Sequence, residues 1–180
     1  MGNAIPAGGP TQDEVMALCL FKMDLEPTDT MLDLGCGTGK VSIAVSAQVK
    51  KVWAVDRRPE AITYAKEAAK VAGRENIEFF CGEGLDFLKT APVFDCAFVG
   101  GSQQIEDILP LLSKKVRRVI VVNAVLVSTL TSVTTTMQSL GIFREVVHVQ
   151  VSRSHTLGKS LMFKPIDPVY IIVGKGGSCS

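Results

Sequence analysis

The strongest constraint on the fold is a glycine-rich loop that directly follows a short apolar strand. Residues 30–34 (T-M-L-D-L) predict a buried strand, and residues 33–39 read D-L-G-C-G-T-G. Glycine accepts the positive φ angles of a tight turn, so this pattern is typical of a strand that turns at once into a helix. Strand, turn and helix form the unit from which parallel sheets are built. The sequence therefore predicts an α/β fold with this loop at the carboxyl end of its first strand.

The rest of the chain continues the alternation of strands and helices. We expect further strands at residues 52–55, 77–81, 94–99 and 119–123, and helices at residues 41–48, 59–72, 105–112 and 126–140. A helix that ends near residue 23 precedes them, and Thr11 and Glu14 form a capping-box pattern at its start. Residues 147–151 alternate apolar and polar side chains, and residues 169–173 form a last strand. These elements predict a mostly parallel seven-stranded sheet with helices on both faces and a C-terminal antiparallel β-hairpin.

Composition places the chain among ordinary globular proteins. It is 47% hydrophobic and 21% charged, and its length of 180 residues suits a single domain, with residues 1–10 extended and residues 175–180 as a disordered tail. The net charge of +1 gives no electrostatic reason to expect a nucleic-acid partner. The five cysteines lack metal-ligand spacing, and the longest apolar run is too short for a bilayer. We therefore expect a cytoplasmic protein without a metal site.

Three interpretations of the glycine loop compete. A dinucleotide fingerprint, G-x-G-x-x-G, requires glycine at position 40, where Lys40 stands. A phosphate-binding loop requires glycine at position 34 and Ser or Thr at position 41, but these are Leu34 and Val41. The pattern D-x-G-x-G-x-G is the motif of the class I S-adenosylmethionine-dependent methyltransferases, which residues 33–39 resemble fully. A tight turn with no ligand is the structural alternative.

An acidic residue at the end of the second strand supports a nucleoside ligand. Asp56 occupies this position, where a carboxylate accepts hydrogen bonds from both ribose hydroxyls and disfavours a 2′-phosphate. This carboxylate fits either NAD or S-adenosylmethionine, so the glycine spacing decides between them. Glu83 and Gly84 follow the third strand, where methyltransferases of this class contact adenine.

Four segments in chain order carry a closer resemblance. They are residues 5–11 (I-P-A-G-G-P-T), residues 33–39, residues 54–57 (A-V-D-R) with 59–62 (P-E-A-I), and the V-G-G-S sequence at residues 99–102. Over residues 5–174 the chain resembles the decarboxylating cobalt-precorrin methyltransferase family of cobalamin biosynthesis. The resemblance implies a Rossmann-like class I methyltransferase fold. It also implies methylation of a corrin ring carbon coupled to decarboxylation of an acetate side chain. A homotetramer is expected.

The same resemblance assigns site residues by position. S-adenosylmethionine, or its product S-adenosylhomocysteine, would be bound by Thr11, Asp33, Gly35, Cys36, Gly37, Thr38, Gly39, Asp56, Arg57, Glu83, Gly84 and Gly100. The small-molecule corrinoid substrate would be bound by Gly101, Ser102, Arg153 and Lys159. The chain departs from the family at Gln103 and Gln104, where further glycines are usual, and at Lys40, where a small residue is often found.

Cations between the last two predicted strands suit a polyanionic macrocycle. Arg153, His155, Lys159 and Lys164 lie in this polar segment, and arginine and lysine bind carboxylates well. We expect the segment to roof the ligand crevice, although a solvated loop explains the same residues. No residue is identified as catalytic. A class I methyltransferase that acts on RNA or protein, and a non-catalytic S-adenosylmethionine-binding module, remain the alternative functions.

Overall fold

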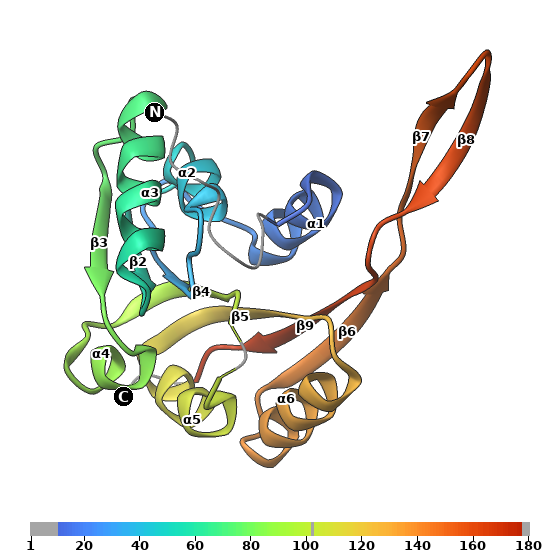
Figure 1. The fold of residues 1–180 in the computed structure, drawn as a ribbon. Helices are drawn as coiled ribbons and strands as arrows, with labels where there is room; N and C mark the ends of the chain where they lie inside the picture. Colours follow the sequence, from blue (N-terminus) through green and yellow to red (C-terminus); the bar gives the residue numbers. More distant parts are fainter. Residues whose placement is uncertain (1–10, 102, 178–180) are drawn as a thin grey trace.

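A seven-stranded sheet forms the centre of the computed structural model, which describes residues 11–101 and 103–177 (Figure 1). Its strands are β1 (Thr30–Leu34), β2 (Lys51–Asp56), β3 (Ile77–Cys81), β4 (Phe94–Val99), β5 (Val116–Ala124), β6 (Phe143–Val149) and β9 (Val169–Lys175). Their order across the sheet is β3-β2-β1-β4-β5-β9-β6. β9 runs antiparallel to both of its neighbours, and the pairs among β1 to β5 are parallel. The predicted fold class is confirmed.

Helices cover both faces of this sheet (Figure 1). α1 (Asp13–Met23), α2 (Lys40–Ser46) and α3 (Pro59–Val71) lie on one face, and α4 (Gly84–Thr90), α5 (Ile105–Lys115) and α6 (Val127–Ser139) on the other. Strand β4 shows how the two cores are separated, because Cys96 and Phe98 pack toward α1 and α2 while Ala97 and Val99 pack toward α5. Both faces of β1 and β4 are therefore largely buried, whereas the edge strand β3 is only partly buried.

The start of α1 differs from the predicted capping box. The N-cap is Gln12, and its side chain makes no capping hydrogen bond. Glu14 instead binds the Arg153 guanidinium, with Arg153 Nε 2.9 Å from Glu14 Oε1. The Thr11 carbonyl accepts a hydrogen bond of 2.7 Å from Lys40 Nζ. The prediction was wrong because distant cations, which a local pattern does not reveal, bind this first turn.

A second sheet projects from the end of β6 and β9. It consists of β7 (Ser152–Leu157) and β8 (Ser160–Pro165), which are antiparallel and join through Gly158 at a φ of +60°. Figure 1 shows this arm extending away from the main sheet, and all of its strand residues are exposed. The expectation that this segment roofs the ligand crevice is therefore not met within one chain.

The chain ends partly as expected. Residues 1–10, Ser102 and residues 178–180 lie outside the described residues, so the expectation of an extended N-terminal segment concerns a part that is not described. Lys175 belongs to β9, and the Gly176 amide donates a 2.7 Å hydrogen bond to the Arg118 carbonyl. A disordered tail from residue 175 onward is therefore wrong for Lys175 and Gly176. None of the described helices is long and apolar enough to cross a membrane.

Candidate functional site

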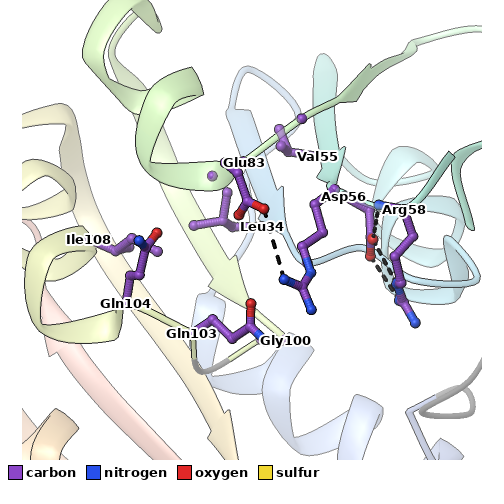
Figure 2. A pocket seen from close by; sticks show the side chains of 14 residues that line it. Leu34, Val55, Asp56, Arg58, Glu83, Gly100, Gln103, Gln104 and Ile108 are labelled. Carbon is purple, nitrogen blue, oxygen red and sulfur yellow. Dashed lines mark hydrogen bonds and ion pairs between the residues drawn. The ribbon is translucent and has the colours of Figure 1, made fainter.

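A cavity of about 370 Å³ opens beyond the carboxyl ends of β1, β2, β3 and β4 (Figure 2). This is where ligands bind in open α/β sheets, near the point at which the strand order reverses on either side of β1. The lining residues come from four loops and from α5: Leu34, Gly35, Val55, Asp56, Arg57, Arg58, Gly82, Glu83, Gly84, Gly100, Gly101, Gln103, Gln104 and Ile108. Its size falls in the usual range for a small-molecule site.

The first glycine of the loop forms a wall of this cavity together with the turn after β4. Gly35 has a φ of +79°, and a Cβ atom there would lie 2.9 Å from the Gly101 backbone nitrogen. The Gly100 amide in turn donates a 2.9 Å hydrogen bond to the Leu34 carbonyl. Two backbones thus pass in direct contact because neither turn carries a side chain at this point.

Asp56 is the most heavily bonded group at the cavity. Its Oδ1 accepts hydrogen bonds from the Arg58 amide at 3.0 Å and from Arg58 Nε at 2.9 Å. Its Oδ2 accepts hydrogen bonds from the Gly37 amide at 2.9 Å and from Arg58 Nη2 at 3.0 Å. Burial raises the pKa of Asp56, but these bonds outweigh burial and hold the pKa below its ordinary value. The carboxylate is therefore charged at neutral pH. It holds the glycine loop through the Gly37 amide and also lines the cavity.

Asp33 lies beneath the glycine loop and has no exposed surface. Its Oδ2 accepts a hydrogen bond from the Ser42 hydroxyl of α2, and its Oδ1 has no hydrogen-bond partner. Burial raises the pKa of Asp33 to about 7, with the Ser42 hydrogen bond acting in the opposite direction. Asp33 ties the strand to the helix that follows the loop, and the structure does not bring it to the cavity.

The opposite wall carries Glu83 and Gly84, as the sequence predicted. A Cβ atom at Gly84 would lie 2.9 Å from Leu34 Cδ1, so a side chain there would disturb the floor of the cavity. Glu83 Oε1 lies 3.9 Å from Arg57 Nη1, and both side chains are half exposed. An ion pair this long and this exposed is weak, so both groups are available to a ligand.

The predicted site residues separate into two groups. Seven of them line the cavity: Gly35, Asp56, Arg57, Glu83, Gly84, Gly100 and Gly101. Six of the residues predicted to bind S-adenosylmethionine do not line it: Thr11, Asp33, Cys36, Gly37, Thr38 and Gly39. Gly37 contributes through its bond to Asp56, and a Cβ atom at Gly39 would lie 2.8 Å from the Ala65 Cβ atom of α3. Much of the motif therefore shapes the loop and does not face the ligand space.

The predicted substrate residues are less well gathered. Ser102 lies outside the described residues. Arg153 stands at the base of the projecting arm and is paired with Glu14, and Lys159 lies at the tip of that arm. Neither residue lines the cavity in this chain. The arrangement corrects the expectation that the segment carrying these cations roofs the ligand crevice.

Sequence reasoning missed seven lining residues: Leu34, Val55, Arg58, Gly82, Gln103, Gln104 and Ile108. Figure 2 shows Arg58 against Asp56 at one end of the cavity and Gln104 with Ile108 at the other. The two glutamines stand where the sequence departs from the family pattern. The signal for Arg58 was its position two residues after Asp56, which places the two side chains within reach across a turn.

The polar groups, the apolar surface and the shape of the cavity fit S-adenosylmethionine. Asp56 supplies a charged acceptor for hydroxyl groups, and Leu34, Val55 and Ile108 supply apolar surface of the kind a purine ring covers. Glycines at positions 35, 84 and 100 keep the walls free of side chains where a ligand would approach the backbone. No group of three or more His, Cys, Asp or Glu residues in the described part of the chain has a metal-binding arrangement.

Comparison with known proteins decides the family. A model described as the precorrin methyltransferase domain matches residues 7–174. The chain belongs to the precorrin methyltransferase family. A relative from Methanosarcina mazei, named "Probable cobalt-precorrin-6B C(15)-methyltransferase (decarboxylating)", is 45% identical over 174 residues. That match covers 94% of this chain and 95% of the relative.

Crystal structures of two relatives share this fold over most of their length. The structure described as precorrin 8w decarboxylase from Methanobacterium thermoautotrophicum has a TM-score of 0.89 and 29% identity, covering 92% of this chain and 91% of that one. The precorrin-6y C5,15-methyltransferase of Geobacter metallireducens also has a TM-score of 0.89 and 29% identity, covering 96% and 94% of the two chains. A more distant S-adenosylmethionine-dependent O-methyltransferase from Thermotoga maritima, at 15% identity, shares the fold with a TM-score of 0.76.

Proposed function

We propose that this chain transfers a methyl group from S-adenosylmethionine to a ring carbon of a cobalt-precorrin and releases carbon dioxide from an acetate side chain of the same macrocycle. The observation that carries this proposal is the cavity beyond β1 to β4, whose glycine walls and Asp56 carboxylate stand where a class I methyltransferase holds its methyl donor. The names of relatives at up to 45% identity support the substrate.

The methyl donor, S-adenosylmethionine, would be held by residues on both sides of β1. We assign the ribose hydroxyls to Asp56, the adenine to the wall formed by Glu83 and Gly84, and the methionine part to the side of Gly35 and Gly100. Thr11, Asp33, Cys36, Thr38 and Gly39 would act by shaping the loop. S-Adenosylmethionine supplies an activated methyl group on a sulfonium sulfur.

The protein's task is then positioning and exclusion of water. Methyl transfer forms a bond from the ring carbon to the methyl carbon and breaks the bond to sulfur, and it needs in-line approach more than acid–base assistance. In the decarboxylation, the bond between carboxylate and acetate methylene breaks and the conjugated macrocycle accepts the electron pair before a proton is added. No described residue at the cavity is needed as a covalent partner, in keeping with the absence of an identified catalytic residue in the sequence.

The macrocycle would approach over the turn after β4. Gly100 and Gly101 line this side of the cavity, and Gln103 with Gln104 supplies neutral amide donors where the family has glycines. Because the arm extends away from the main sheet and none of its residues lines the cavity, we propose that Arg153 and Lys159 meet a bound macrocycle from another copy of the chain.

We propose that the arm also explains self-association as a homo-oligomer, a tetramer by family resemblance. Leu157, Leu161 and Phe163 are 64%, 73% and 69% exposed on it. Leu161 and Phe163 are two residues apart on β8, so they share one face, where an apolar surface stands open to solvent. A second copy of the same arm would cover this face.

The enzyme would act as a single domain over residues 1–180 in the cytoplasm, where thiols stay reduced.

Binding calorimetry tests the donor site directly. The wild-type chain should bind S-adenosylhomocysteine and not NAD, and Asp56→Ala should weaken binding by about 1.5–3 kcal/mol because hydrogen bonds to a charged acceptor are lost. Asp86→Ala is the matched control, since Asp86 is an exposed carboxylate on α4 that pairs with Lys89 and does not line the cavity. Tight NAD binding without binding of the methyl donor would contradict the assignment.

A further inference from the structure

We propose that the Arg58 side chain occupies, in the free protein, the two acceptor positions on Asp56 that the ribose hydroxyls of the methyl donor take when it binds. Donor binding then exchanges a guanidinium group for a nucleoside, and Arg58 determines how much of the affinity comes from the hydroxyls. This inference rests on the proposed function, because it concerns the same cavity. It is carried by the hydrogen bonds of Asp56.

The Asp56 carboxylate has no acceptor capacity left. An ionised carboxylate has about four lone-pair positions on its two oxygens. Each Asp56 oxygen already accepts two hydrogen bonds, all between 2.9 and 3.0 Å. A ribose that presents two hydroxyl donors to this carboxylate therefore has to replace two of the present donors.

Among the donors to Asp56 described above, the guanidinium is the one carried by a side chain, and the others are backbone amides. The Gly37 amide is part of the glycine loop, and the Arg58 amide belongs to the N-cap of α3, whose carbonyl accepts hydrogen bonds from Ala61 and Ile62. The guanidinium instead stands at the end of a flexible side chain that is 31% exposed, whereas the Asp56 side chain is 4% exposed. The two mobile donors, Nε and Nη2, equal in number the two hydroxyls of a ribose.

The position of the guanidinium agrees with such an exchange. Both Asp56 and Arg58 line the cavity, and Figure 2 shows them facing each other at one end of it. Arg58 Nη2 would lie 3.7 Å from a Cβ atom placed on Gly37, so the guanidinium covers the glycine loop itself. The guanidinium therefore holds acceptor positions on Asp56 at a place that both side chains share with the cavity.

The exchange makes a prediction that a purely supporting role does not. If Arg58 competes with the ribose, Arg58→Met, which keeps the aliphatic stem and removes both donors, should bind S-adenosylhomocysteine about three- to tenfold more tightly. If Arg58 only orients Asp56 for the ligand, the same substitution should weaken binding. Arg58→Lys, with a single ammonium that cannot form the paired contact, should bind with intermediate affinity.

A double-mutant cycle with the ligand isolates the contact. Calorimetry would compare S-adenosylhomocysteine with its 2′-deoxy analogue on wild-type protein and on Arg58→Met. We expect the missing hydroxyl to weaken binding about tenfold in Arg58→Met and only about threefold in the wild type. The effect is smaller in the wild type because the deoxy ligand has to displace one Arg58 hydrogen bond fewer from Asp56. Arg74→Met is the matched control: Arg74 is an exposed arginine that does not line the cavity, and its loss should leave the hydroxyl effect unchanged.

The outcomes separate this inference from the proposed function. Equal hydroxyl effects in the wild type and in Arg58→Met, or weaker binding by Arg58→Met of both ligands, would overturn the exchange while leaving the donor site intact. Failure of the wild-type chain to bind S-adenosylhomocysteine would instead overturn the proposed function.

If Arg58→Met does not fold, the Arg58 Nε–H signal of the wild-type protein in nitrogen-edited NMR tests the exchange instead. It should shift strongly and exchange faster with water when S-adenosylhomocysteine is added, and an unchanged signal would refute the exchange.

Discussion

Substitution of Gly35 by alanine should damage the cavity far more than the same substitution at other glycines with similar backbone angles. Gly35, Gly39 and Gly73 have φ angles of +79°, +75° and +64°, so each alanine adopts the left-handed region at a cost of about 1 kcal/mol. A Cβ atom at Gly73 meets nothing within 4 Å, and Gly73→Ala measures this conformational cost alone.

The other two variants add different contacts. At Gly39 the new Cβ atom would lie 2.8 Å from the Ala65 Cβ atom, and at Gly35 it would lie 2.9 Å from the Gly101 nitrogen. Overpacking of this kind adds about 1–3 kcal/mol, so both variants should lose about 2–4 kcal/mol of unfolding free energy in urea. Only Gly35→Ala should displace the Gly100–Gly101 turn and weaken S-adenosylhomocysteine binding, by about tenfold or more. Wild-type affinity in Gly35→Ala, measured by calorimetry beside the other two variants, would refute the close-approach argument.

Three further predictions follow from particular groups. Burial raises the folded-state pKa of Asp33 to about 7 from an ordinary 3.8, so its contribution to stability is fully present below that ordinary value and is lost as the pH rises toward 7. Urea titrations between pH 4 and 8 should therefore show the wild type losing stability relative to Asp33→Asn over this range, and parallel curves would contradict the raised pKa. Phe163→Glu on the arm should lower the oligomeric state in sedimentation analysis without changing donor affinity, and an unchanged sedimentation coefficient would count against the arm as the contact between copies. Glu14→Gln should loosen the base of the arm, seen as faster amide exchange at Arg153 and its neighbours, whereas unchanged exchange would show that the ion pair does not hold it.

Much of the main sheet was predictable because most of its strands are short apolar runs. The apolar runs that form β1, β3 and β4 have the same bounds in the structure as in the sequence analysis. The glycine loop and Asp56 could be placed at one edge because parallel strands present their carboxyl ends together. The close contact of Gly35 with Gly101 could not be predicted in the same way, since it depends on β1 and β4 being neighbours in the sheet.

Other elements lacked a local signal. Helix α4 has seven residues, of which only Leu88 is buried, too few for a helical period to show. The arm carries no strand signal in the sequence, because all of its strand residues are exposed and show no apolar alternation toward a core of their own chain. The pairing of Arg153 with Glu14 joins residues far apart in the chain, and no spacing rule connects them. These failures concern surfaces and long-range ion pairs, whereas the buried framework followed from its pattern.

Mass spectrometry of the reaction product tests the central claim most directly. The purified chain would be incubated with a cobalt-precorrin mixture and S-adenosylmethionine that carries an isotopically labelled methyl group. The account predicts a corrinoid product that gains one labelled methyl group and loses one carbon dioxide, together with one equivalent of S-adenosylhomocysteine. Donor binding without any labelled corrinoid, or label recovered in RNA or protein instead, would contradict it.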